Sequence, residues 1–152
     1  MKPIQRLILC AMTLFACSAG MSLAEESAQN DAKLFHTMQD VDLADLKWIK
    51  RPVIVFADSP NDPAFIEQMD LLRAGRADLS ERDVIIITDT APDPLSDLRR
   101  KLRPRGFMLV LIGKDGGVKL RKPFPWDVRE ISRSIDKMPI RQREIREGKD
   151  SQ

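Results

Sequence analysis

An apolar, β-branched run, Arg51-Pro52-Val53-Ile54-Val55-Phe56-Ala57, decides the fold class of this 152-residue chain. Apolar residues without alternation are typical of a strand that is covered on both faces, as in a parallel sheet. Val84-Ile85-Ile86-Ile87-Thr88 is a second run of the same kind, and Ala64 to Ser80 between them carries apolar residues at helical spacing. Two buried strands joined by such a helix predict a parallel pair with a right-handed crossover.

Four further elements are predicted downstream. They are a short basic helix from Leu95 to Leu102, a strand from Phe107 to Ile112, an edge strand from Val118 to Leu120, and a last helix that begins near Val128 and ends before Pro139. Lys114-Asp115-Gly116-Gly117 joins the two strands as a hairpin, because Asp-Gly pairs tolerate the positive φ of tight turns. We therefore predict an α/β fold of three layers, in the order β-α-β-α-β-β-α, whose sheet has parallel central strands and an antiparallel hairpin edge.

This order of elements resembles the thioredoxin core. Three segments, 51–57, 106–119 and 135–142, are also similar to the DUDES family. That family is a thioredoxin-like domain of unknown function found in small secreted bacterial proteins and in animal matrix and sushi-repeat proteins. The resemblance implies a fold and an extracellular address, and it supplies no catalytic residue.

The N-terminal segment is typical of a secretory leader. A basic start precedes an apolar run, residues 7–16, that is shorter than the roughly 20 residues needed to cross a bilayer. Small side chains at Ser22 and Ala24 predict cleavage between Ala24 and Glu25. We therefore expect a periplasmic or secreted protein.

One alternative remains open for the leader. Leu14-Phe15-Ala16-Cys17 has the form of a lipoprotein processing box, although Phe15 is bulky for it. Processing there would leave a lipidated Cys17 that anchors the protein to a membrane, and we expect membrane attachment only in that case. Cys10 and Cys17 are the two cysteines of the chain, so cleavage after Ala24 leaves no thiol.

We divide the chain into a signal peptide (1–24), a flexible tether (25–42), a thioredoxin-like domain (43–140) and a basic C-terminal tail (141–152). Removal of the signal peptide leaves 23 basic and 23 acidic residues, because only Lys2 and Arg6 lie within it. One domain of this size can bury a core without disulfides.

The turn after the first strand, Asp58-Ser59-Pro60-Asn61-Asp62, is the first candidate binding site. In the resembled thioredoxins the redox cysteines lie at this place, so we expect no thiol–disulfide exchange here. Exposed N–H groups at the helix start would favour an anionic ligand or partner. The simpler reading is a capped turn, with Asp62 as N-cap and Pro63 at the first helical position.

A cluster of basic residues is the second candidate. Its members are Arg99, Arg100, Lys101, Arg103 and Arg105, which Lys119, Arg121 and Lys122 could join across the hairpin. Such a face would bind an acidic partner, a polysaccharide or lipid headgroups. We expect no nucleic acid, because no aromatic residues interleave the charges. The alternative is a solvated exterior of mixed charge.

Other chemistry finds little support in the sequence. His36 is the only histidine, and a triad with Ser59 would lack the flanking glycines of a nucleophile turn. The carboxylates show no metal-ligand spacing, so we expect neither metal nor cofactor. By comparison with thioredoxins we also predict a cis Arg103–Pro104 bond, against the alternative of a trans proline that ends a helix.

The sequence therefore predicts an exported, non-catalytic binding module that meets an envelope or extracellular macromolecule. Contact would be made through Asp58, Ser59, Asn61 and Asp62, or through Arg99, Arg100 and Arg103. The alternative is a cysteine-independent enzyme, a hydrolase or a peroxide-handling protein, with an unidentified site.

Overall fold

The computed structural model describes residue 29 and residues 31–150. Its five strands form one mixed sheet in the order β1-β3-β2-β4-β5. The strands are β1 (Phe35–Thr37), β2 (Arg51–Phe56), β3 (Val84–Asp89), β4 (Met108–Ile112) and β5 (Val118–Lys122). The helices are α2 (Pro63–Ala74), α3 (Arg76–Glu81), α4 (Asp97–Leu102), α5 (Val128–Asp136) and α6 (Pro139–Asp150).

The strand pairing confirms the predicted fold class. Strands β2 and β3 are parallel, with Val53 opposite Ile86, and β1 joins the other side of β3 in parallel. Strand β4 runs antiparallel to β2, and β5 continues antiparallel as the edge beyond it. The predicted hairpin closes with Gly116 at a φ of 79°.

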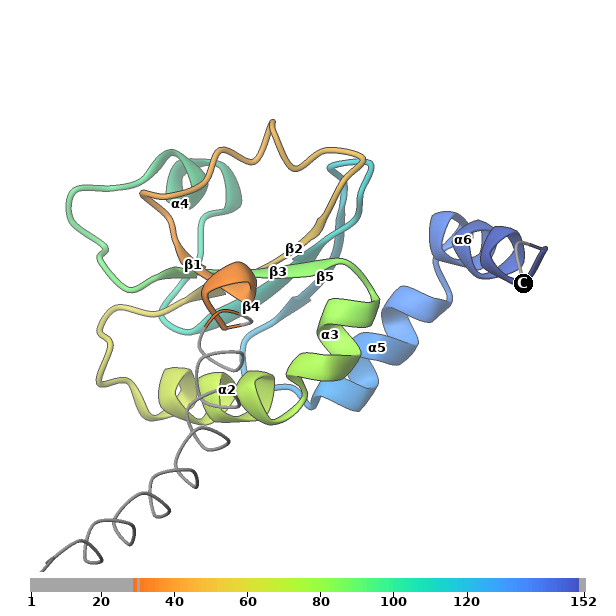
Figure 1. Cartoon of the computed structure of the whole chain (residues 1–152). Helices are drawn as coiled ribbons and strands as arrows, with labels where there is room; N and C mark the ends of the chain where they lie inside the picture. The colour runs from red at the N-terminus through yellow and green to blue at the C-terminus, as the bar shows by residue number, and fades with distance from the viewer. Residues whose placement is uncertain (1–28, 30, 151–152) are drawn as a thin grey trace, which may run out of the picture.

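Strand β2 is buried along its whole length because its side chains point alternately into two apolar cores. Val53 and Val55 belong to the larger core, which α2, α3 and α5 cover on one face of the sheet (Figure 1). Ile54 and Phe56 belong to the smaller core on the other face, where Leu98 and Leu102 of α4 pack against them. Helix layers on both faces explain the lack of alternation in the sequence of this strand.

The helix predicted from Ala64 to Ser80 is two helices, and Gly75 lies between α2 and α3. A Cβ atom built on Gly75 would lie 2.5 Å from Cγ1 of the buried Val128 in α5. Because Gly75 has no side chain, the backbone at this break can lie directly against α5. The predicted start of the helix is confirmed, since Asp62 accepts hydrogen bonds from the N–H groups of Ala64 and Phe65.

Three other segments differ from the sequence-based expectations. Residues 35–37, expected in the flexible tether, form β1, since the buried Leu34 fixes the chain beside β3. Residues 141–150 of the predicted basic tail belong to α6. The one cis peptide bond in the described chain is Asp93–Pro94, so the predicted cis bond at Arg103–Pro104 is wrong. There Arg103 ends α4 in the left-handed conformation, with a φ of 50°, and the helix cap itself makes the turn.

No helix among the described residues has the length and apolar character needed to span a membrane. The predicted signal peptide, the cleavage position at Ala24 and Glu25, and the alternative anchor at Cys17 lie outside the described residues.

The contact between Gly75 and Val128 gives a stability prediction. Gly75→Ala forces the new methyl group into Val128, so we expect a lower free energy of unfolding, by about 1 to 3 kcal/mol. Gly148→Ala is the matched control, because nothing lies within 4 Å of a Cβ at this exposed position in α6. Urea denaturation of both variants checks the prediction. A Gly75→Ala protein as stable as the wild type would contradict the close packing.

Candidate functional site

The candidate site lies where β2 and β3 end. The carboxyl ends of parallel strands meet at one edge of a sheet, which is where open α/β sheets place their ligands. Ala57 and Asp58 follow β2, Asp89 is the last residue of β3, and α4 brings Arg99 to the same edge. The structure thus joins the two candidates of the sequence, the turn after β2 and the basic helix.

Arg99 is buried, with 4% of its surface exposed, and its guanidinium group is held on several sides. Its Nε donates to Oδ1 of Asp89 at 2.9 Å, and Nη2 donates to the carbonyl oxygens of Ala57 and Asp89. The guanidinium carbon also lies 5.4 Å from the centre of the Phe56 ring. Arg99 therefore ties the ends of β2 and β3 to α4, and it is not part of an open basic face.

Ser96 binds the carboxylate oxygen of Asp89 that Arg99 does not bind. As the N-cap of α4, it accepts a hydrogen bond from the N–H of Arg99 and donates its own hydroxyl to Oδ2 of Asp89 at 2.7 Å. Both carboxylate oxygens of the buried Asp89 are thereby satisfied, as burial of a charge requires.

The turn after β2 meets this cluster through one residue. Asp58 lies with its Oδ1 3.6 Å from Nη1 of Arg99, and 61% of its side chain is exposed. Ser59 accepts a hydrogen bond from the N–H of Asn61, and Asp62 caps α2. Of the four turn residues predicted as a binding site, Asp58 is the one whose side chain contacts Arg99. Ser59 and Asp62 satisfy the local backbone.

The remaining basic residues lie on the surface beside this site. Arg100 is exposed and pairs with Asp97 in its own helix. We define the basic face as Lys101, Arg103, Arg105 and Arg121, which are all exposed. Arg121 of β5 donates to the carbonyl oxygen of Leu102 at 2.7 Å, so the edge strand and the end of α4 adjoin. Among the described residues, no carboxylate forms an ion pair with a member of this face.

Lys122 is not part of the basic face, because its side chain lies on the opposite side of β5 from that of Arg121. Its Nζ lies 4.4 Å from the centre of the Trp126 ring and 5.8 Å from that of Phe124. Trp126 is half-buried, and its backbone is bonded to the side chain of Gln68. Trp126 therefore covers the larger core, as an aromatic residue beside a helix start often does.

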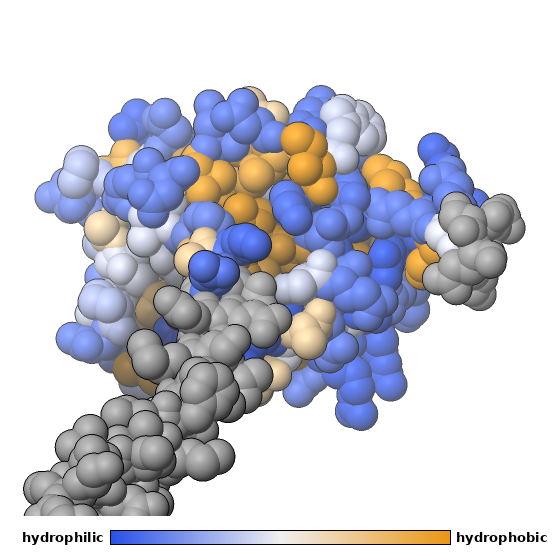
Figure 2. Space-filling view, viewed as in Figure 1, coloured by the Kyte–Doolittle hydropathy of each residue, from blue (hydrophilic) through white to orange (hydrophobic). Residues whose placement is uncertain are grey.

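A groove of about 800 Å³ lies beside α4, between the loop of residues 38–50 and the hairpin. Leu98, Leu102 and Ile112 line it with apolar surface, and Lys101 lies at its rim. Figure 2 shows apolar side chains gathered between α4 and the hairpin, with hydrophilic residues around them.

The other expected chemistry can be placed as well. His36 lies in β1, with its Nε2 3.1 Å from the carbonyl oxygen of Lys33, while Ser59 bonds within its own turn. No contact joins His36 and Ser59 in the part of the chain that the structure describes. Among the same residues, no three His, Cys, Asp or Glu side chains lie together in a group that could hold a metal ion.

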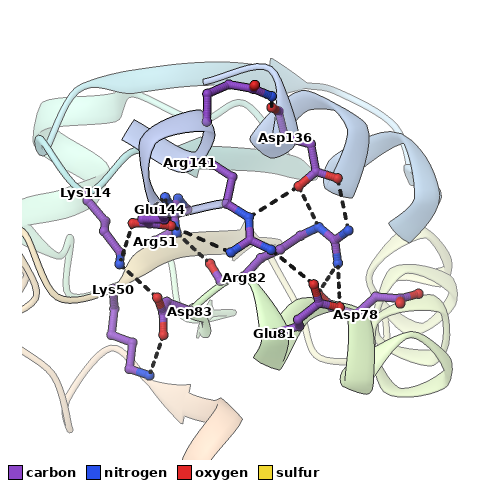
Figure 3. A network of polar contacts seen from close by, with 11 residues as sticks. Lys50, Arg51, Asp78, Glu81, Arg82, Asp83, Lys114, Asp136, Arg141 and Glu144 are labelled. Atoms are coloured by element: carbon purple, nitrogen blue, oxygen red, sulfur yellow. Dashed lines mark hydrogen bonds and ion pairs between the residues drawn. The ribbon is translucent and has the colours of Figure 1, made fainter. Parts of the chain in front are cut away.

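A second polar network, at the opposite end of β2, was missed by sequence reasoning (Figure 3). Arg51 is fully buried, and its Nη2 donates to both carboxylate oxygens of Glu144 in α6 at 3.0 Å. Lys114 of the hairpin pairs at 2.8 Å with both Glu144 and Asp83. Arg51, Lys114 and Arg141 come from the three segments that carry the family resemblance, and this was the available signal.

The acids of this network have lowered pKa values. Burial raises the pKa of Glu144, but the hydrogen bonds and charges of Lys114 and Arg51 outweigh it, so the net shift is downward. The same balance holds for two other acids. Burial raises the pKa of Asp83, but the cations around it, Lys114 foremost, lower it by more; burial raises the pKa of Asp136, but the cations around it, Arg82 foremost, lower it by more. All three carboxylates are therefore charged at neutral pH.

One family model and several solved structures are similar to this chain. The family model described as "Domain of unknown function (DUF4174)" matches residues 42–144. Prx1a of Plasmodium yoelii is 18% identical with a TM-score of 0.51, over 63% of this chain and 77% of that one. Thioredoxin peroxidase I of the same organism is 18% identical (TM-score 0.46; 63% and 76% covered). The mitochondrial 2-Cys peroxiredoxin of Plasmodium falciparum is 17% identical (TM-score 0.47; 63% and 79% covered). The likeness to Prx1a shows the thioredoxin-like fold alone.

The buried ion pair gives a second stability prediction. Arg99→Met leaves Asp89 charged and without its partner in the interior, and such losses cost about 3 to 5 kcal/mol of unfolding free energy. Arg100→Met is the control, because an exposed pair contributes about 0 to 1 kcal/mol. Guanidinium denaturation followed by circular dichroism measures both. Equal effects of the two substitutions would contradict the role assigned to Arg99.

Proposed function

Because this chain belongs to the DUF4174 family, whose description assigns no activity, we propose its function from its own residues: it is an exported, non-catalytic thioredoxin-fold binding module. One observation carries the proposal. At the edge of the sheet where thioredoxins hold their thiols, this chain has Asp58 and a buried Arg99 that is bonded to Asp89 and to backbone carbonyls. These groups hold strands and helix together, and the turn has no side chain for electron transfer.

The basic face is the proposed contact surface. Lys101, Arg103 and Arg105 are exposed within five residues of one another, and Arg121 extends the face onto β5. Their charges are not neutralised by ion pairs within the described chain, so they attract an acidic macromolecule from solution. Arg99 and Arg100, which the sequence suggested for this contact, are already paired with Asp89 and Asp97.

The leader sequence supports a partner that is located in the envelope or outside the cell. The basic start, the apolar run at 7–16 and the small residues before Glu25 have the features of a cleaved leader. We place the mature protein in the periplasm or in the medium, with a lipid anchor at Cys17 as the alternative.

A charge-reversal experiment tests the basic face. The triple variant Lys101→Glu, Arg103→Glu, Arg105→Glu should bind labelled oligoglutamate at least tenfold more weakly than the wild type, by fluorescence anisotropy at low salt. The slope of binding against salt concentration should also fall, since fewer cations meet the probe. A parallel titration with heparin distinguishes an acidic polysaccharide from an acidic polypeptide.

The control reverses three exposed charges elsewhere, Arg76→Glu, Arg129→Glu and Arg143→Glu, so the net charge is the same in both variants. Binding that falls equally in the two triple variants would contradict a specific face. Retained binding in the first variant would overturn the proposal.

A further inference from the structure

Helix α6 is attached to the domain mainly through charged side chains. Glu144 bonds to Arg51 and Lys114, and Arg141 lies within 3.1 to 3.7 Å of carboxylate oxygens of Glu81, Asp136 and Glu144. The two isoleucines of α6, Ile140 and Ile145, are only half-buried and belong to neither apolar core. Figure 1 shows α6 at the end of the molecule beyond α5, away from the helices that cover the sheet.

Glu144 occupies a preformed site for a carboxylate. Arg51 is held by β2, and its Nη1 also donates to the carbonyl oxygen of Arg82 at 2.8 Å. Lys114 is held by the hairpin and by Asp83, to which Lys50 lies at 3.8 Å. Both cations therefore stay in place without α6, and Figure 3 shows them converging on the Glu144 carboxylate.

We propose that Arg51 and Lys114 form a carboxylate-binding site that α6 fills as a displaceable internal ligand. When α6 leaves, a glutamate on a helix of a partner polypeptide takes the place of Glu144. This proposal is independent of the basic face, because no residue of that face takes part in the contacts of Glu144.

The physical balance favours opening of α6 before the core unfolds. A helix whose apolar side chains are only half-buried gains little free energy from their burial, and its attachment through ion pairs weakens as the salt concentration rises. Because the pKa of Glu144 is lowered in the docked state, its contribution is present above the ordinary value of 4.5. That contribution is lost as the pH falls through the lowered value. The pKa values of Asp83 and Asp136 are lowered too, so these carboxylates lose their charge in the same way and weaken the same network.

Hydrogen exchange measured by mass spectrometry on the full chain tests the displacement. Amides of residues 139–150 should exchange at least tenfold faster in Glu144→Gln than in the wild type, while those of β2 and β3 stay protected. Arg146→Gln, an exposed position in the same helix, should change nothing. If α6 exchanges no faster than β2 and β3 in both proteins, or if Glu144→Gln exposes the whole chain equally, the proposal is wrong.

A peptide added in trans tests the site itself. A synthetic copy of residues 139–150 should accelerate exchange of the chain's own α6 at least threefold, because it competes for Arg51 and Lys114. The same peptide with glutamine at the position of Glu144 is the matched control. The effect should disappear in Lys114→Met. Opening of α6 without any peptide effect would overturn the carboxylate site, and neither result depends on the basic face.

Discussion

Complete burial of β2 is the constraint on which the rest of the structure depends. Helices cover both faces of this strand, and β3 and β4 take up its hydrogen bonds, so charged groups can meet it only at its two ends. Each end carries a buried arginine, Arg51 at the start and Arg99 beyond the finish. Because a buried guanidinium needs a carboxylate, each arginine fixes the position of another element. Arg51 holds α6 through Glu144, and Arg99 holds α4 against Asp89.

The two ends differ in what their ion pairs allow. Arg99 pairs with an acid on the neighbouring strand, so its contact persists as long as the sheet does. Arg51 pairs with Glu144 on α6, a helix that contributes no residue to either core. The same kind of ion pair thus holds α4 against the sheet at one end and, in our proposal, forms an exchangeable contact with α6 at the other. Between these two ends the chain has a thioredoxin-like scaffold.

Local patterns in the sequence predicted the scaffold well. Unbroken apolar runs gave the central strands, the Asp-Gly pair gave the hairpin, and Asp62 with Pro63 gave the start of α2, because each depends on neighbours in the chain. Contacts between distant residues were not predictable in this way. The break at Gly75 depends on Val128, burial of Arg99 depends on Asp89, and docking of α6 depends on Arg51. A cluster of arginines in sequence therefore looked like one surface, although the fold buries one of its members.

The two borders of the sheet have a consequence for behaviour at high concentration. Strand β1 offers only three residues, and β5 projects the exposed charges of Lys119 and Arg121. A second chain that approached β5 to extend the sheet would have to bury the Lys119–Asp115 ion pair and the charge of Arg121, which has no ion-pair partner among the described residues. The exposed charges of this edge strand thus guard against strand-to-strand aggregation, and one of them, Arg121, also belongs to the basic face.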